Sequence, residues 1–96
     1  MSKAAAFIEA EGMVAVFDAV DAMVKATDVT VEGTMRLGGG IVAVALSGDL
    51  ATVEEATEIG VATARSLTRG KVSSVIFASP SVPVSAIAAN TARIDG

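Results

Sequence analysis

Two successive segments of this chain follow the same plan of an apolar strand, an amphipathic helix and a second strand. An apolar run at residues 4–9 ends before Gly12, and this run predicts a strand. Apolar side chains then recur at three- and four-residue spacing, which predicts an amphipathic helix over residues 13–27. The apolar stripe of that helix comprises Met13, Val16, Phe17, Val20, Met23 and Val24. Residues 29–35 alternate between apolar and polar, which is the period of a half-buried strand.

The second segment begins with a continuous apolar run at residues 41–46, which favours a central strand. A Ser-Gly-Asp turn follows, and Asp49 is the predicted N-cap of the next helix. The apolar stripe of this helix comprises Val53, Ala56, Gly60, Ala64 and Leu67. Because a glycine inside a helix lowers its stability, Gly60 predicts close packing against the sheet or the other helix. Gly70 is the predicted C′ residue, and residues 72–78 form a further strand.

The predicted order is therefore strand, helix, strand, strand, helix, strand. Two βαβ-like halves joined by a hairpin give an antiparallel sheet with both helices on one face, so we predict an α+β protein with the ferredoxin-like βαββαβ pattern. A short C-terminal helix is predicted at residues 84–90. We expect a single domain over residues 1–96, with a core at about 4–78 and a variable tail at 79–96.

The composition excludes several classes of chemistry. The chain has no cysteine and no histidine, so it has no thiolate nucleophile, disulfide, Cys/His metal site or imidazole proton shuttle. We therefore expect no catalytic residue, no metal and no cofactor. The net charge of -4 has the wrong sign for binding a phosphate backbone, and no apolar run approaches the ~18 residues of a membrane span. We expect neither a nucleic acid nor a membrane as a partner.

A hydrophobic fraction of 52% in only 96 residues predicts that part of the apolar surface is buried against copies of the same chain. The carboxylates near the second predicted helix do not indicate a catalytic site. Glu54, Glu55 and Glu58 lie near the predicted start of the second helix, where acidic residues usually complement the helix dipole. We interpret them in that way and not as catalytic groups.

The three consecutive glycines Gly38, Gly39 and Gly40 form the most informative local motif. They begin a formal match to G-x-G-x-x-A, but a dinucleotide fingerprint requires a helix after the glycines and here a strand follows. Two interpretations remain open: a flexible hairpin turn, or a loop whose backbone N–H groups approach a polar or anionic solute. Arg36 is either a solvated charge at the end of a strand or a group that sets the potential at a ligand site or pore mouth.

Several blocks of sequence are distinctive when they are taken together. They are Ile8-Glu9-Ala10-Glu11-Gly12, Asp21-Ala22-Met23-Val24-Lys25-Ala26, Arg36-Leu37-Gly38-Gly39-Gly40-Ile41-Val42-Ala43-Val44, and Gly48-Asp49 before a helix that carries Ala56 and Gly60. With these blocks the chain resembles the single-domain hexameric shell proteins of bacterial microcompartments, over about residues 4–78.

The resemblance implies a structural protein, not an enzyme, within a microcompartment shell in the cytoplasm. Members of that family form cyclic homo-hexamers, which tile edge to edge with neighbouring hexamers and other shell proteins into facets around encapsulated enzymes. By position, Gly38, Gly39 and Gly40 would line a central pore for small polar metabolites, with Arg36 near its mouth. Lys25 would lie at the edge between hexamers.

The sequence departs from the family pattern in two places. The family commonly carries Pro-Arg-Pro-His after the last strand, whereas this chain has Ser79-Pro80-Ser81-Val82-Pro83, so we expect weaker tiling or tiling that depends more on Lys25. The central pore position is often serine, and Gly39 predicts a wider opening whose selectivity comes from backbone dipoles.

An alternative interpretation is a ferredoxin-like regulatory domain that binds a small metabolite at a subunit interface. A small carboxylate-dependent enzyme is disfavoured because no acid–base pair is visible.

Overall fold

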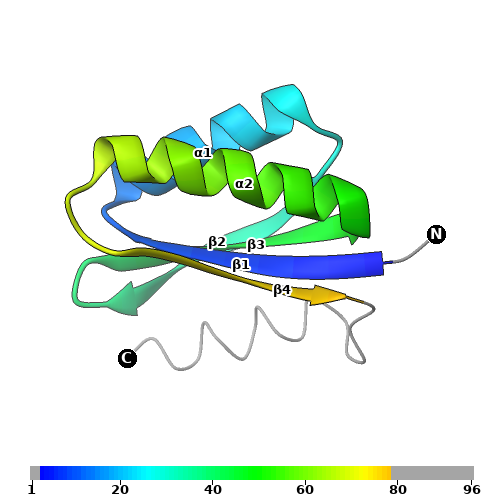
Figure 1. Ribbon diagram of the computed structural model, residues 1–96. Helices are drawn as coiled ribbons and strands as arrows, with labels where there is room; N and C mark the ends of the chain where they lie inside the picture. The colour runs from blue at the N-terminus through cyan, green and yellow to red at the C-terminus, as the bar shows by residue number, and fades with distance from the viewer. Residues whose placement is uncertain (1–2, 79–96) are drawn as a thin grey trace.

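Residues 3–78 are described by a computed structural model, in which one antiparallel sheet carries both helices on the same face (Figure 1). The elements in chain order are β1 (Lys3–Glu11), α1 (Met13–Ala26), β2 (Thr30–Gly38), β3 (Ile41–Asp49), α2 (Leu50–Leu67) and β4 (Val72–Ala78). The strand order is β2-β3-β1-β4. The predicted βαββαβ fold is confirmed, and the predicted C-terminal helix at 84–90 lies outside the described residues.

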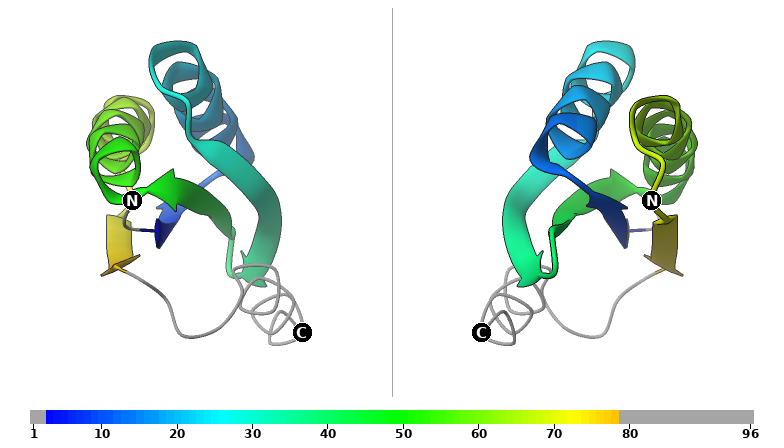
Figure 2. Two further views of the ribbon diagram at one scale, coloured as in Figure 1. Left: turned by 90° about the vertical axis from the view of Figure 1, so that its right-hand side faces the viewer. Right: turned by 90° about the vertical axis from the view of Figure 1, so that its left-hand side faces the viewer.

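The two central strands supply the floor of the hydrophobic core. Strand β1 pairs antiparallel with β3 on one side and with β4 on the other, and Ile8 lies opposite Val44 and Ser74. Side chains alternate between the two faces of a strand, so every second residue of β1 and β3 points toward the helices. These core residues are Ala4, Ala6, Ile8, Ala10, Val42, Val44 and Leu46. Figure 2 shows α2 above the β4 side of the sheet and α1 above the β2 side.

The close packing predicted at Gly60 is confirmed, and it involves both the sheet and the other helix. A Cβ added to Gly60 would lie 2.6 Å from the Met23 Sδ atom on α1 and 2.9 Å from the Ile8 Cδ1 atom on β1. Both distances are shorter than real Cβ contacts. Gly60 therefore lets α2 lie close to α1 and β1, and a larger residue would require Met23 and Ile8 to move.

The predicted apolar stripe of α1 is partly wrong. The buried residues of this helix are Ala15, Val16, Ala19 and Met23. Phe17 and Val24, which were assigned to the stripe, are exposed together with Val14. The small side chains of Ala15 and Ala19 let the helix approach the sheet and α2 closely, and they share the inward face with the larger Val16 and Met23.

The predicted start of α2 at Leu50, with Asp49 as the N-cap, is confirmed, whereas the predicted roles of its acidic residues and of Gly70 need correction. Asp49 is the N-cap, but its side chain makes no capping hydrogen bond. The helix begins at Leu50, so Glu54, Glu55 and Glu58 lie beyond its first turn, where the helix dipole has little effect. At the other end Thr68 is the C-cap in an extended conformation, and its N–H donates to the Ala64 carbonyl at 3.1 Å. Gly70 lies two residues farther on without a positive φ, so it is not a left-handed C′ stop.

Candidate functional site

The β2–β3 hairpin uses all three consecutive glycines for backbone geometry. Gly39 and Gly40 form the turn with φ values of 63° and 82°, and two positive values are what a type I′ hairpin turn requires. Gly38 has a φ of 87° and lies where the pairing register shifts after Arg36. The interpretation of this segment as a hairpin turn is confirmed. The remaining glycine, Gly38, lies at the irregularity in the pairing of β2 with β3.

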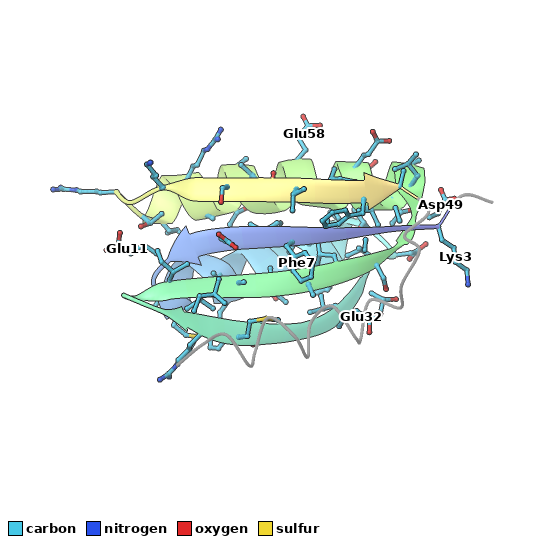
Figure 3. The ribbon with its side chains drawn as sticks, turned by 90° about the horizontal axis from the view of Figure 1, so that it is seen from below. Lys3, Phe7, Glu11, Glu32, Asp49 and Glu58 are labelled. Carbon is cyan, nitrogen blue, oxygen red and sulfur yellow. The ribbon has the colours of Figure 1, made fainter. Side chains whose placement is uncertain are left out.

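The tip of this hairpin is attached to the corner between β1 and α1. The Gly12 N–H donates to the Gly40 carbonyl at 2.9 Å, and Gly12 itself has a φ of 97°. A Cβ on Gly40 would lie 3.9 Å from the Glu11 Cγ atom, so the turn packs against the stem of that side chain. Figure 3 shows Glu11 at the end of the sheet where the hairpin turns. Sequence reasoning missed this contact because its residues lie in separate segments.

The structure places Arg36 beside the glycine turn, as the sequence predicted from their proximity. The exposed Arg36 helps to line an open pocket of about 470 Å³. The other lining residues are Gly12, Met13, Gly38, Gly40, Ile41 and Val42. The pocket therefore joins the hairpin to the start of α1, and both a guanidinium and several backbone groups border it.

Lys25 lies at the opposite end of the molecule from the hairpin. Helix α1 begins beside the hairpin and carries Lys25 in its last turn, about 20 Å away along the helix axis (Figure 1). The Lys25 Nζ atom lies 2.9 Å from the Asp21 Oδ2 atom, and this hydrogen bond raises the pKa of Lys25 above its usual value. The two side chains are 74% and 60% exposed, so the pair stabilises the fold little. The structure thus separates Lys25 from Arg36 and the glycines.

Two surfaces that sequence reasoning missed lie on opposite flanks of the molecule, one apolar and one of mixed polarity. The α1 ridge consists of Val14, Phe17 and Val24, and Phe17 is 53% exposed. Their spacing of three and seven residues places them on one side of the helix, so the sequence spacing could have revealed this ridge. The second surface, the α2–β4 groove, is an open cavity of about 490 Å³ lined by Glu54, Thr57, Glu58, Val61, Ala62, Arg65, Ser74 and Ile76.

Thr57 is the unusual member of the α2–β4 groove. Its side chain is buried, with an exposure of 5%, and its Oγ1 atom has no hydrogen-bond partner within residues 3–78. A buried hydroxyl without a partner is unfavourable by about 1–3 kcal/mol. Thr57 therefore brings a buried hydroxyl without a partner among the described residues to the wall of this groove.

The described residues contain no arrangement that supports metal chemistry. Across residues 3–78, no group of three or more Asp or Glu side chains is placed to hold a metal ion. Glu54 and Glu58 border the α2–β4 groove as exposed carboxylates. Neither helix in the described part of the chain has the length and hydrophobicity needed to cross a lipid bilayer.

Comparison with known proteins identifies the family of this chain. The family described as the BMC domain matches residues 4–80. The chain belongs to the BMC-domain family. Among curated relatives, the bacterial microcompartment shell protein PduA of Citrobacter freundii is 38% identical over 74 residues, which cover 77% of this chain and 80% of PduA. The carboxysome shell protein CcmK2 of Thermosynechococcus vestitus is 41% identical over 81 residues, covering 83% of this chain and 79% of CcmK2.

A solved structure supports the BMC-domain fold. A microcompartment protein from Desulfitobacterium hafniense matches with a TM-score of 0.71 and 23% identity over 88% of this chain. This chain spans about half of that protein's length, 47%. BMC-domain membership and these relatives make the protein a structural component of a microcompartment shell. They do not favour the alternative of a metabolite-binding regulatory domain.

Proposed function

We propose that this BMC-domain protein forms a cyclic homo-hexamer in which six hairpins meet at the symmetry axis. The observation that carries the proposal is the placement of two unlike surfaces on the two flanks of one subunit: the α1 ridge on one and the α2–β4 groove on the other. A contact between unlike surfaces generates a ring when its rotation closes. An isologous dimer would instead need one self-complementary patch.

The chemistry of the two flanks suits contact between neighbouring subunits. The ridge offers exposed Val14, Phe17 and Val24, and complete burial of a large apolar side chain contributes about 1.5–3 kcal/mol. The groove offers Val61 and Ile76 as apolar walls, and the unpartnered Thr57 hydroxyl as a hydrogen-bonding group. Docking of one flank on the other removes apolar surface from water at every contact in the ring.

The hairpin end then becomes the lining of the central opening. Gly38, Gly39 and Gly40 would present backbone groups to the axis, and Arg36 would lie near the mouth. Among residues 3–78, a Cβ on Gly39 would meet nothing within 4 Å, so this part of the chain leaves the position open. Backbone dipoles at a constriction replace part of the hydration shell of a polar solute. We therefore assign passage of small polar metabolites to this opening.

The opposite end would form the outer edge of the hexamer. Lys25 is highly exposed there, on the last turn of α1, where neighbouring hexamers and other shell proteins would meet it. The tiled layer would enclose enzymes while the subunit itself contributes no catalysis. Residues 4–78 would form the shell core, with residues 79–96 as a variable tail.

Native mass spectrometry and negative-stain electron microscopy test the ring. We expect six subunits per particle and hexagonal arrays at high protein concentration. The variant Phe17→Asp places a charge on the α1 ridge and should give folded monomers, with helical content preserved by circular dichroism because Phe17 is exposed. Phe17→Leu keeps an apolar side chain and should retain the ring. A discrete dimer or tetramer in the unmodified protein would overturn the proposal.

A further inference from the structure

We propose that Gly70 is a positioning residue for the glycine hairpin, acting through Glu11. Three loops meet at the hairpin end of the molecule: the β1–α1 corner, the β2–β3 turn and the α2–β4 loop (Figure 1). Gly70 lies in the α2–β4 loop, and the structure joins it to Glu11 and then to Gly40 by direct contacts. The consequence for solute passage rests on the proposed function, whereas the contacts themselves do not.

The Glu11 side chain leaves no room for a Cβ atom at Gly70. A Cβ at this position would lie 2.8 Å from the Glu11 Cβ atom and 3.0 Å from the Glu11 Cδ atom, and it would also overlap the Glu11 Oε2 atom. Gly70 does not have a positive φ, so its backbone conformation is open to any residue. Its N–H donates to the Thr68 Oγ1 atom at 3.1 Å, which holds the loop in this position.

Glu11 lies between the Gly70 loop and the hairpin turn. Its Cγ atom would be 3.9 Å from a Cβ on Gly40, so the same side chain packs toward both loops. The next residue, Gly12, donates the hydrogen bond to the Gly40 carbonyl. A displacement of the Glu11 backbone therefore moves the donor that holds the hairpin turn.

A methyl group at position 70 cannot be accommodated by a change of Glu11 rotamer alone. Rotation about the Glu11 side-chain bonds moves Oε2 and Cδ, but it leaves Cβ at 2.8 Å from the added methyl carbon. Glu11 is the last residue of β1, and the pairing of β1 with β4 stops one residue earlier, at Ala10 opposite Val72. Glu11 is paired with Ile41 of β3 but has no β4 partner, so the end of β1 is held on one side only and can shift, carrying Gly12 with it.

Hydrogen–deuterium exchange on the full-length protein tests this chain of contacts. In Gly70→Ala, the Gly12 amide should exchange about tenfold faster, while amides in the middle of β1 keep their protection, because only the local opening changes. Gly33→Ala is the matched control, since a Cβ at Gly33 meets nothing within 4 Å in the described part of the chain and Gly33 has no positive φ. Unchanged exchange of the Gly12 amide in Gly70→Ala would overturn the proposal.

A double-mutant cycle separates positioning from a general loss of stability. Glu11→Gly removes the Cβ, Cγ and carboxylate atoms that the methyl group would meet, so Gly70→Ala should have no further effect on the Gly12 amide in that background. An equal effect in both backgrounds would contradict a role through Glu11. Glu11→Ala removes the side-chain stem that packs toward Gly40 without introducing a clash, so it should accelerate exchange of the Gly12 amide relative to the unmodified protein, and unchanged exchange would contradict a role of Glu11. This variant keeps the proposal testable if Gly70→Ala folds poorly.

Solute flux through assembled shells distinguishes this proposal from the pore assignment. With the hexamer mass unchanged, Gly70→Ala should alter flux because the turn at the opening is released. Faster Gly12 exchange with unaltered flux would support positioning by Gly70 and count against the hairpin as the route of passage. Unaltered exchange would reject positioning by Gly70, whatever the flux.

Discussion

At the hairpin end, backbone groups and glycines from three loops touch one another, whereas at the opposite end Lys25 projects into solvent and contacts a single aspartate. The first arrangement depends on φ values and on space that only glycine leaves. The second depends on the charge and reach of side chains. Substitutions should therefore affect the two ends differently: those at the hairpin end alter the fold itself, and those at the Lys25 end alter only contacts with other molecules.

The largest expected effect is on stability, at the hairpin end. Gly40→Ala must hold a φ of 82°, which is unfavourable for an L-residue by about 1–2 kcal/mol. Gly33→Ala, in β2 without a positive φ, should be neutral or slightly stabilising. Urea unfolding at one fixed protein concentration measures both. Equal stability of the two variants would contradict the proposed dependence of the hairpin end on glycine backbone conformation.

A smaller structural effect is expected at Gly39, with a larger effect on solute passage. Asparagine tolerates the left-handed conformation, so Gly39→Asn should cost less than about 1 kcal/mol at the observed φ of 63°. Its amide should reduce flux through shells while the hexamer stays intact. Gly39→Ala is the control, because it adds a methyl group without an amide that reaches into the opening. Undiminished flux in Gly39→Asn would count against Gly39 as a pore residue.

At the other end, Lys25→Ala should leave the stability of the subunit essentially unchanged, since exposed ion pairs contribute little. Hexamers should persist, and hexagonal arrays should become smaller or require more protein in electron micrographs. Lys71→Ala removes the same charge at the hairpin end and should leave arrays unchanged. Dissociation of Lys25→Ala into monomers would place Lys25 inside the ring and not at its edge.

The smallest effect concerns the protonation of Lys25. Asp21→Asn removes the carboxylate that raises the pKa of Lys25, so that pKa should fall toward its usual value. Because the folded-state pKa is raised, the contribution of the pair is present below the usual lysine pKa and is lost as the pH rises through the raised value. NMR titration of the Lys25 side chain measures the change, with Asp18→Asn as the control. A pKa that does not move would show that Asp21 does not hold Lys25 in solution.

The sequence predicted those parts of the fold that depend on local periodicity and on neighbouring residues. Strand alternation and helical spacing located the six elements, and Gly60 indicated tight helix packing that the structure confirms. Phe17 was assigned to the buried stripe because hydrophobicity alone does not show that smaller alanines provide the closer approach.

The candidate site was predictable only where its residues are adjacent in the chain. Arg36 and the glycines share one hairpin, so their proximity follows from sequence. The contacts of Glu11 with Gly40 and Gly70 join three loops that meet only after the sheet has formed. A glycine that leaves space for a distant side chain has no local signature, and for this reason Gly70 was mistaken for a helix stop.

Strand β4 has a further consequence for subunits that have not assembled. It is an edge strand, paired only with β1 within residues 3–78, and its sequence Val-Ser-Ser-Val-Ile-Phe-Ala has no charge, proline or glycine. Exposed Val75, Ile76 and Phe77 give it the composition of segments that add to one another in cross-β aggregates. Free subunits would therefore be prone to aggregation until this strand edge is covered. In the proposed ring, assembly would shorten the time for which this edge is free, and the folded monomers of Phe17→Asp should aggregate more readily on heating than the assembled protein.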